Sequence, residues 1–220
     1  MSTNYVKFVS EKKKWLTAIL LSLAYIIPAF FYIKYAHTAS SELMATSFIA
    51  ASTASLLFAT ALSLGSISHF TSWPNMRLGY QKQIGVLAFW YSCFYCITLL
   101  ILYPEVYWYG FFSNFFSYDI LLGSMAMVIF TTMVLINSKV VSPHIPRETI
   151  TFVLGLGYVG YALLVIRSIL IELPIWYVWF ETFLGPPPGR LVLSVIAFGV
   201  LILRLAVAID KHLHPSLQSR

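Results

Sequence analysis

Charged residues are scarce in this sequence, since Asp, Glu, Lys and Arg together make up only 10% of its 220 residues. A soluble domain carries about 25%, so this chain has too few charges to cover a surface that faces water. Hydrophobic residues instead reach 59% and aromatic residues 17%. The shortage excludes an ordinary soluble domain and predicts that the solvent of this protein is lipid.

Cysteine is also nearly absent. The two cysteines, Cys93 and Cys96, lie inside one apolar segment, so they exclude a disulfide framework. They form a C-x-x-C pair on one helix face without being placed to bridge easily. Because thiols in apolar surroundings are usually inert, we interpret the pair as packing, and a redox role is the alternative.

Several other signatures are missing. The apolar run after Lys14 is too long for a signal-peptide core and lacks a small-residue cleavage site, so we expect no cleavable leader. No solenoid-length repeat or low-complexity linker appears, which indicates one domain. The net charge of +6 is spread over short basic runs between apolar stretches, so we expect no nucleic-acid partner.

Long apolar runs are what the sequence does have. About 20 helical residues cross the ~30 Å hydrocarbon core of a bilayer, and unbroken apolar runs exclude the alternating strands of a β-barrel. We therefore predict an all-α integral membrane protein, with a transmembrane domain at 15–210 between tails at 1–14 and 211–220. Its six spans are approximately Trp15–Ile33, Leu43–Ser68, Gly85–Tyr103, Ile120–Asn137, Ile150–Leu170 and Leu191–Ile209.

Lysine and arginine are divided unevenly between the two sides of these spans. Cytoplasmic loops carry the excess of basic residues, so the side with ten of them, which also holds both termini, is predicted to be cytoplasmic. Those ten are Lys7, Lys12, Lys13, Lys14, Arg77, Lys82, Lys139, Arg147, Lys211 and Arg220. The other side has Lys34 and Arg190, with Glu42, Glu105, Asp119, Glu172 and Glu181. We expect a bacterial inner membrane.

Two connections on the less basic side are rich in aromatic residues, VYWYGFFSNFFSY at Val106–Tyr118 and LPIWYVWFETF at Leu173–Phe183. Both are too short to span, and Trp and Tyr prefer the headgroup level. We expect both to lie along the outer membrane surface. The alternative is a docking surface for a partner or a lid over a substrate.

The run Gly155–Gly160 matches G-x-G-x-x-G, the dinucleotide-binding fingerprint. That function needs a preceding strand and a tight turn at a helix N-terminus, whereas this run lies inside an apolar span. We reject the fingerprint and expect the glycines to make room on a helix face for a neighbouring backbone or a flat ligand.

Two arginines fall inside predicted spans, where an unpaired charge costs several kcal/mol. Arg204 lies near the cytoplasmic end of the last span, and we expect it to reach toward Asp210 or the headgroups. Arg167 lies near the outer end of the fifth span, about one turn from Glu172. On a face partly cleared by Gly160, Arg167 could fill a cavity or hold an anion.

Two helices carry a resemblance to a known family. KQIGVLAFWYSCFY, from Lys82, resembles the third helix of ferric-reductase-like transmembrane domains, including the STEAP metalloreductases and the haem-binding subunit of periplasmic methionine sulfoxide reductase. LGYVGYALLVIR, from Leu156, resembles the family's fifth helix. The residues of the third helix that match in order are Lys82, Ile84, Gly85, Ala88, Phe89, Trp90 and Tyr91. The resemblance implies six helices, b-type haem and transmembrane electron transfer.

The chain departs from this family where haem would be ligated. The matched positions hold Tyr95 on the third helix and Leu154 and Arg167 on the fifth. A buried phenol resists ionisation and arginine has no free lone pair, so we expect no haem bound in the family's manner, and no metal. The histidines lie in tails, loops or helix ends, namely His37, His69, His144, His212 and His214.

The sequence thus favours a ferric-reductase-like protein that has lost haem and serves as a non-catalytic membrane subunit. We expect it to bind a lipid, a small ligand, or a membrane or periplasmic protein, in or at the former haem cavity. Tyr95 and Arg167 would fill that cavity, hydrogen-bonded to each other. Its other candidate lining residues are Tyr91, Gly157, Gly160 and Leu164. The alternatives are a haem-dependent electron-transfer subunit, which is an oxidoreductase, and a small transporter.

Overall fold

The structure is a computed structural model that describes residues 2–36, 41–71, 79–138 and 141–213. Within these residues six helices are long and apolar enough to cross a membrane, and no strand occurs. The prediction of an all-α membrane protein is confirmed. The helices are α1 (Ser2–Ala36), α2 (Glu42–Phe70), α3 (Gly79–Leu102), α4 (Tyr118–Ile136), α5 (Arg147–Thr182) and α6 (Gly189–Leu213), with short turns η1 (Glu105–Tyr109) and η2 (Ser142–His144).

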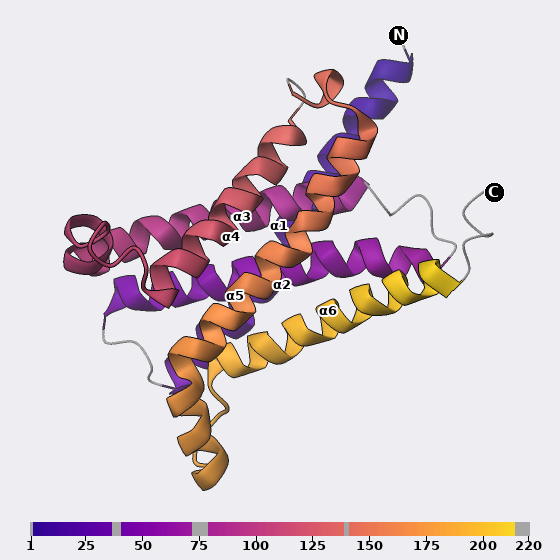
Figure 1. The fold of residues 1–220 in the computed structure, drawn as a ribbon. Coiled ribbons are helices and arrows are strands. Elements are labelled where there is room, and N and C mark those ends of the chain that lie inside the picture. Colours follow the sequence, from indigo (N-terminus) through magenta and orange to yellow (C-terminus); the bar gives the residue numbers. More distant parts are fainter. Residues whose placement is uncertain (1, 37–40, 72–78, 139–140, 214–220) are drawn as a thin grey trace.

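Helix α2 is the centre of the bundle (Figure 1). It packs against α1, α3 and α6, while α4 packs mainly on α5 and makes few contacts with α3. Small buried residues on α2, such as Ala50, Ala54 and Ala61, allow neighbouring helices to approach closely. The weak contact between α3 and α4 leaves the space in which the candidate site lies.

The two ends of the bundle differ in character. One, here called the aromatic end, carries the 103–117 connection and the 183–188 turn. The opposite basic end carries Lys12, Lys13 and Lys14 of α1, Lys82 of α3, the start of α1 and the end of α6 (Figure 1). Of the basic residues and histidines named above, Arg77, Lys139, Arg220, His37 and His214 lie outside the described residues.

The packed half of the interior lies toward the basic end. Phe58 of α2 stacks on Phe130 of α4, with ring centroids 4.1 Å apart. Gly160 faces this stack, since a Cβ atom built there would lie 3.1 Å from the Phe130 ring, and Gly157 faces Met133. Both glycines lie within continuous α5, without the turn that the dinucleotide fingerprint needs, and they admit side chains of α4 rather than a flat ligand.

Helix α5 is longer than predicted, which changes the interpretation of one aromatic segment. Leu173–Phe183 is not a separate surface segment, because α5 continues through Pro174 to Thr182 and ends where Phe183 adopts a left-handed φ of 48°. Trp176, 7% exposed, donates from Nε1 to Glu172 across one helical turn. This contact supports the helix across the proline and beyond Leu170, where the predicted span had ended.

The other aromatic segment does connect two helices. After η1 it continues through turns from Gly110 to the start of α4. Phe112 and Phe116 are 90% and 84% exposed, so these rings face away from the bundle. Tyr107 and Phe111 instead point inward and line a cavity.

Helix α6 and the end of α2 meet at the basic end, where Arg204 has an unexpected partner. Its guanidinium lies 4.7 Å from the centre of the Tyr158 ring, and the Tyr158 hydroxyl donates to the Leu62 carbonyl at 2.9 Å. Asp210 bonds His69 at 2.8 Å. Arg204 is therefore accommodated by stacking on an aromatic ring.

Candidate functional site

A cavity of about 490 Å³ lies between α2, α3, α4, α5 and α6, in the half of the bundle nearer the aromatic end. We call it the central cavity, and its main polar lining residues are Tyr95, Asp119, Arg167 and Arg190. A hollow of about 120 Å³ shares these four residues and extends the cavity toward Met44 and Tyr103. The shape and size suit a small molecule rather than bulk water.

Arg167 of α5 is held by Asp119, at the start of α4. The Arg167 Nε atom donates to the Asp119 Oδ1 atom at 2.6 Å and to the Asp119 carbonyl at 3.1 Å, and Nη2 forms an ion pair with Oδ1. Gly123, one turn along α4, leaves room for the guanidinium, 3.5 Å from where a Cβ atom would stand. The pair satisfies an arginine whose side chain is only 14% exposed.

Asp119 has a second partner, Tyr107 of η1, whose hydroxyl donates a hydrogen bond to the Asp119 Oδ2 atom. Burial raises the pKa of Tyr107, and the hydrogen bond to Asp119 and the charge of Asp119 raise it further. The phenol is therefore a protonated donor at any physiological pH. Through this bond the 103–117 connection is tied to α4 directly above the central cavity.

Arg190, on the first turn of α6, forms the second ion pair of the site. Its Nη1 atom lies 3.2 Å from the Oε1 atom of Glu172. The Oε2 atom of Glu172 accepts a hydrogen bond from Trp176. The guanidinium also lies 5.9 Å from the centre of the Phe48 ring. Glu172, which the sequence placed one turn from Arg167, thus pairs with Arg190 instead.

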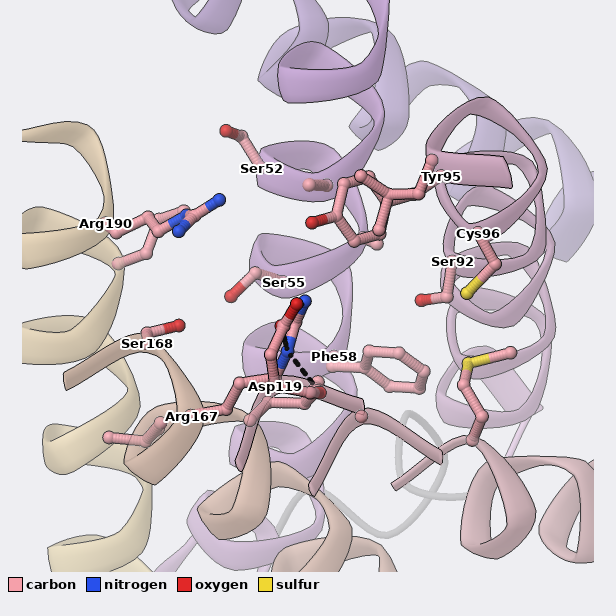
Figure 2. Close-up of a pocket in the computed structure, with 18 of the residues that line it drawn as sticks. Ser52, Ser55, Phe58, Ser92, Tyr95, Cys96, Asp119, Arg167, Ser168 and Arg190 are labelled. Carbon is pink, nitrogen blue, oxygen red and sulfur yellow. Dashed lines mark hydrogen bonds and ion pairs between the residues drawn. The ribbon is translucent and has the colours of Figure 1, made fainter. Parts of the chain in front are cut away.

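Hydroxyl groups surround the space that these charges leave. Figure 2 shows the Arg190 guanidinium and the oxygens of Tyr95, Ser52 and Ser168 directed into the same space. Tyr95 also interacts electrostatically with Arg167. The other serines that line the cavity are Ser55, Ser92, Ser124 and Ser194.

The structure brings together some of the predicted site residues and separates others. Tyr95, Arg167 and Leu164 all line the central cavity. Tyr91, Leu154, Gly157 and Gly160 are not among its lining residues. Tyr91 instead donates to the Ser22 hydroxyl of α1 at 3.5 Å, the two glycines pack on α4, and Leu154 lies much nearer the basic end.

Two of the important side chains were not recognised as site residues from sequence. Arg190 was predicted only as a loop charge, and Asp119 only as an acid near the outer mouth, together with Arg167 and Glu172 in the transporter alternative. A usable signal existed, because the less basic side has few cations and several carboxylates, so an arginine there is expected to find an acidic partner. Cys96 also lines the cavity, whereas Cys93 does not, and both are free thiols.

The lining residues do not fit the b-type haem that the family resemblance implies. No histidine lines the cavity in the part of the chain that the structure describes, and Tyr95 lies beside a guanidinium. His69 bonds Asp210 at the opposite end of the bundle. Among the described residues no cluster of three His, Cys, Asp or Glu side chains could hold a metal ion. A haem held by two imidazoles has no ligand set here.

No protein-family model matches this chain, and no curated protein matches it. Its function must therefore be argued from the chemistry of the central cavity itself.

Proposed function

We propose that this chain is a non-catalytic membrane subunit of ferric-reductase-like ancestry that binds a small ligand in the central cavity. The observation that carries the proposal is the cavity of about 490 Å³ around Tyr95 and Arg167, the positions at which the resemblance expects haem ligands. Neither side chain fills the volume between α3 and α5. A ligand is the simplest occupant of a hollow of this size with convergent polar groups.

The same residues argue against chemistry and against electron transfer. The carboxylate of Asp119 is engaged by Arg167 and Tyr107, so it is a poor general base. The lining serines have no imidazole beside them within the described residues, and hydrolysis by serine needs such a base. Electron transfer across the bilayer needs a carrier, and the haem that the family resemblance implies finds no imidazole ligand among the described lining residues.

A transport function receives less support than binding. Phe58 lines the central cavity and stacks on Phe130, which is 2% exposed, so packed rings border the cavity. A transported molecule would have to displace these packed rings to reach the basic end. A cavity bordered by packed rings favours a binding pocket over a transport pathway.

The proposal includes a membrane and an orientation. The basic loops favour a bacterial inner membrane with both termini in the cytoplasm. The central cavity then lies in the outer half of the bilayer, where a ligand enters from the outer leaflet or the periplasm. A membrane or periplasmic protein partner would meet the aromatic end, which carries the exposed Phe112 and Phe116.

The experiment uses protein reconstituted in nanodiscs, an oxidised and reduced absorption spectrum, and native mass spectrometry. We expect a spectrum without a haem band and a small bound molecule at up to one equivalent. Ser52→Phe should fill the cavity and abolish that molecule, whereas Val159→Phe, at a half-exposed position on α5, should retain it. A stoichiometric haem band that shifts on reduction would overturn the proposal, as would equal ligand content in both variants.

A further inference from the structure

We infer that the ligand of the central cavity is a single-chain amphiphile whose oxyanion head, a carboxylate or a phosphate, is bound by Arg190. This inference rests on the proposed binding function and adds the chemical class of the ligand. It is carried by the absence of an available carboxylate among the described lining residues, the unused donors of Arg190 and the apolar side chains of the deeper lining.

The charged groups of the lining disfavour a cation. Two guanidiniums, of Arg167 and Arg190, and one carboxylate, of Asp119, line the central cavity. Each guanidinium has one carboxylate partner, since Arg167 pairs with Asp119 and Arg190 with Glu172, which is not a lining residue. Both oxygens of Asp119 are already used, Oδ1 by Arg167 and Oδ2 by Tyr107. A cationic ligand would therefore meet two like charges and no available carboxylate.

Arg190 has N–H donors that its ion pair with Glu172 does not use. A guanidinium carries five N–H donors, and Arg190 forms one ion pair, through Nη1 to Glu172 at 3.2 Å. Its side chain is 27% exposed and is directed into the cavity, opposite the hydroxyls of Ser52 and Tyr95 (Figure 2). A planar fork of donors matches an oxyanion with two or more oxygens, and neighbouring hydroxyls can rotate to donate as well.

The deeper wall is suited to an apolar tail. On α6 the lining passes from Arg190 through Leu193 and Ser194 to Ala197, which lies about 10 Å further along the helix at 1.5 Å per residue. The apolar side chains of Phe58, Leu164 and Met127 also line the cavity. A molecule with its head at Arg190 and its tail toward the Phe58–Phe130 stack would match this lining. An inorganic anion would leave the apolar part empty.

Cys96 provides a direct measure of occupancy, because its thiol lines the cavity. The experiment uses full-length protein with Cys93→Ala in zwitterionic nanodiscs and follows modification of Cys96 by methyl methanethiosulfonate with intact-mass spectrometry. Decanoate, decyl phosphate, decanol and decylamine are compared at equal mole fraction in the bilayer. We expect either anion to slow modification at concentrations at least about tenfold lower than decanol, and decylamine to give no protection.

The matched variant is Arg190→Gln combined with Glu172→Gln, because the single change would leave a buried carboxylate unpaired. We expect it to remove the advantage of the anions and leave protection by decanol unchanged. Arg204→Gln, which alters an arginine outside the cavity, should behave as the parent.

The outcomes separate this inference from the proposed function. Protection by only one of the two anions assigns the head to that class and supports the inference. Equal protection by decanol and the anions, or strongest protection by decylamine, overturns it while ligand binding stands. If none of the four compounds slows modification and no molecule co-purifies, the proposed function fails together with the inference.

Discussion

The two arginines inside the predicted spans show two ways of placing a guanidinium in an apolar bundle. Arg204 lies over the Tyr158 ring, 4.7 Å from its centre. The Tyr158 hydroxyl is itself bonded to α2, and Arg204 does not line the central cavity. Arg167 is held by a carboxylate and bordered by Gly123, with small serines around it, so a cavity remains. Of these two arginines, only the one whose neighbours leave space lines a candidate ligand site.

We expect the largest difference between the two arginines when the Asp119 carboxylate is removed. Asp119→Leu leaves Arg167 charged, buried and unpaired, which costs about 3–5 kcal/mol. Arg204→Leu removes only an aromatic stacking contact, worth about 0.5–2 kcal/mol. Unfolding of both variants in mixed micelles of increasing denaturing detergent measures the difference. Equal losses would mean that Arg167 finds another partner and that Asp119 is dispensable.

A smaller loss of stability should distinguish a glycine that faces packed side chains from one that faces open space. Gly160→Leu drives a side chain into Phe130, which is 2% exposed and stacked on Phe58, so we expect a loss of about 1–3 kcal/mol. At Gly155, on the same helix, nothing lies within 4 Å of a Cβ atom. Gly155→Leu should therefore be neutral or slightly stabilising, because leucine favours helix. A stable Gly160→Leu protein would show that the interior near the stack is not tightly packed.

The smallest effect concerns the hydroxyl that ties the 103–117 connection to α4. The pKa of Tyr107 in the folded protein is raised above its unfolded value of about 10. Its hydrogen bond to Asp119 therefore stabilises the fold fully at any pH below about 10. The contribution, about 1 kcal/mol, is lost as the pH rises above about 10. The difference in unfolding free energy between the parent and Tyr107→Phe should shrink in that alkaline range. A difference that stays constant up to strongly alkaline pH would contradict this role.

Hydropathy was sufficient to predict the helices, because burial in lipid demands long apolar runs whatever the packing between them. It located the end of α5 poorly, since Glu172 and Pro174 interrupt the apolar pattern while the helix continues. Arg167 was predictable as a site residue because a charge in a span is costly. Its pairing with Asp119 depends on how α4 lies on α5, which no spacing in the sequence encodes.

The family resemblance was informative for Tyr95 and Arg167, which do lie in one cavity, and misleading for the other expected lining residues. Tyr91 is one helical turn from Tyr95 but reaches α1. Gly157 and Gly160 were expected to open a space and instead admit side chains of α4. Whether a glycine creates a cavity or a close contact is decided by the neighbouring helix.

The length of α5 has a consequence for the membrane itself. Its 36 residues rise about 54 Å, well beyond the ~30 Å of an average hydrocarbon core. Both ends of this helix carry charged residues, Glu148 at the start and Glu172 and Glu181 near the end, so its ends extend past the hydrocarbon core. A thicker bilayer would cover more of the exposed Leu173 and Ile175, which a thin one would leave in water. Lipid chain length thereby becomes a determinant of where this protein is most stable.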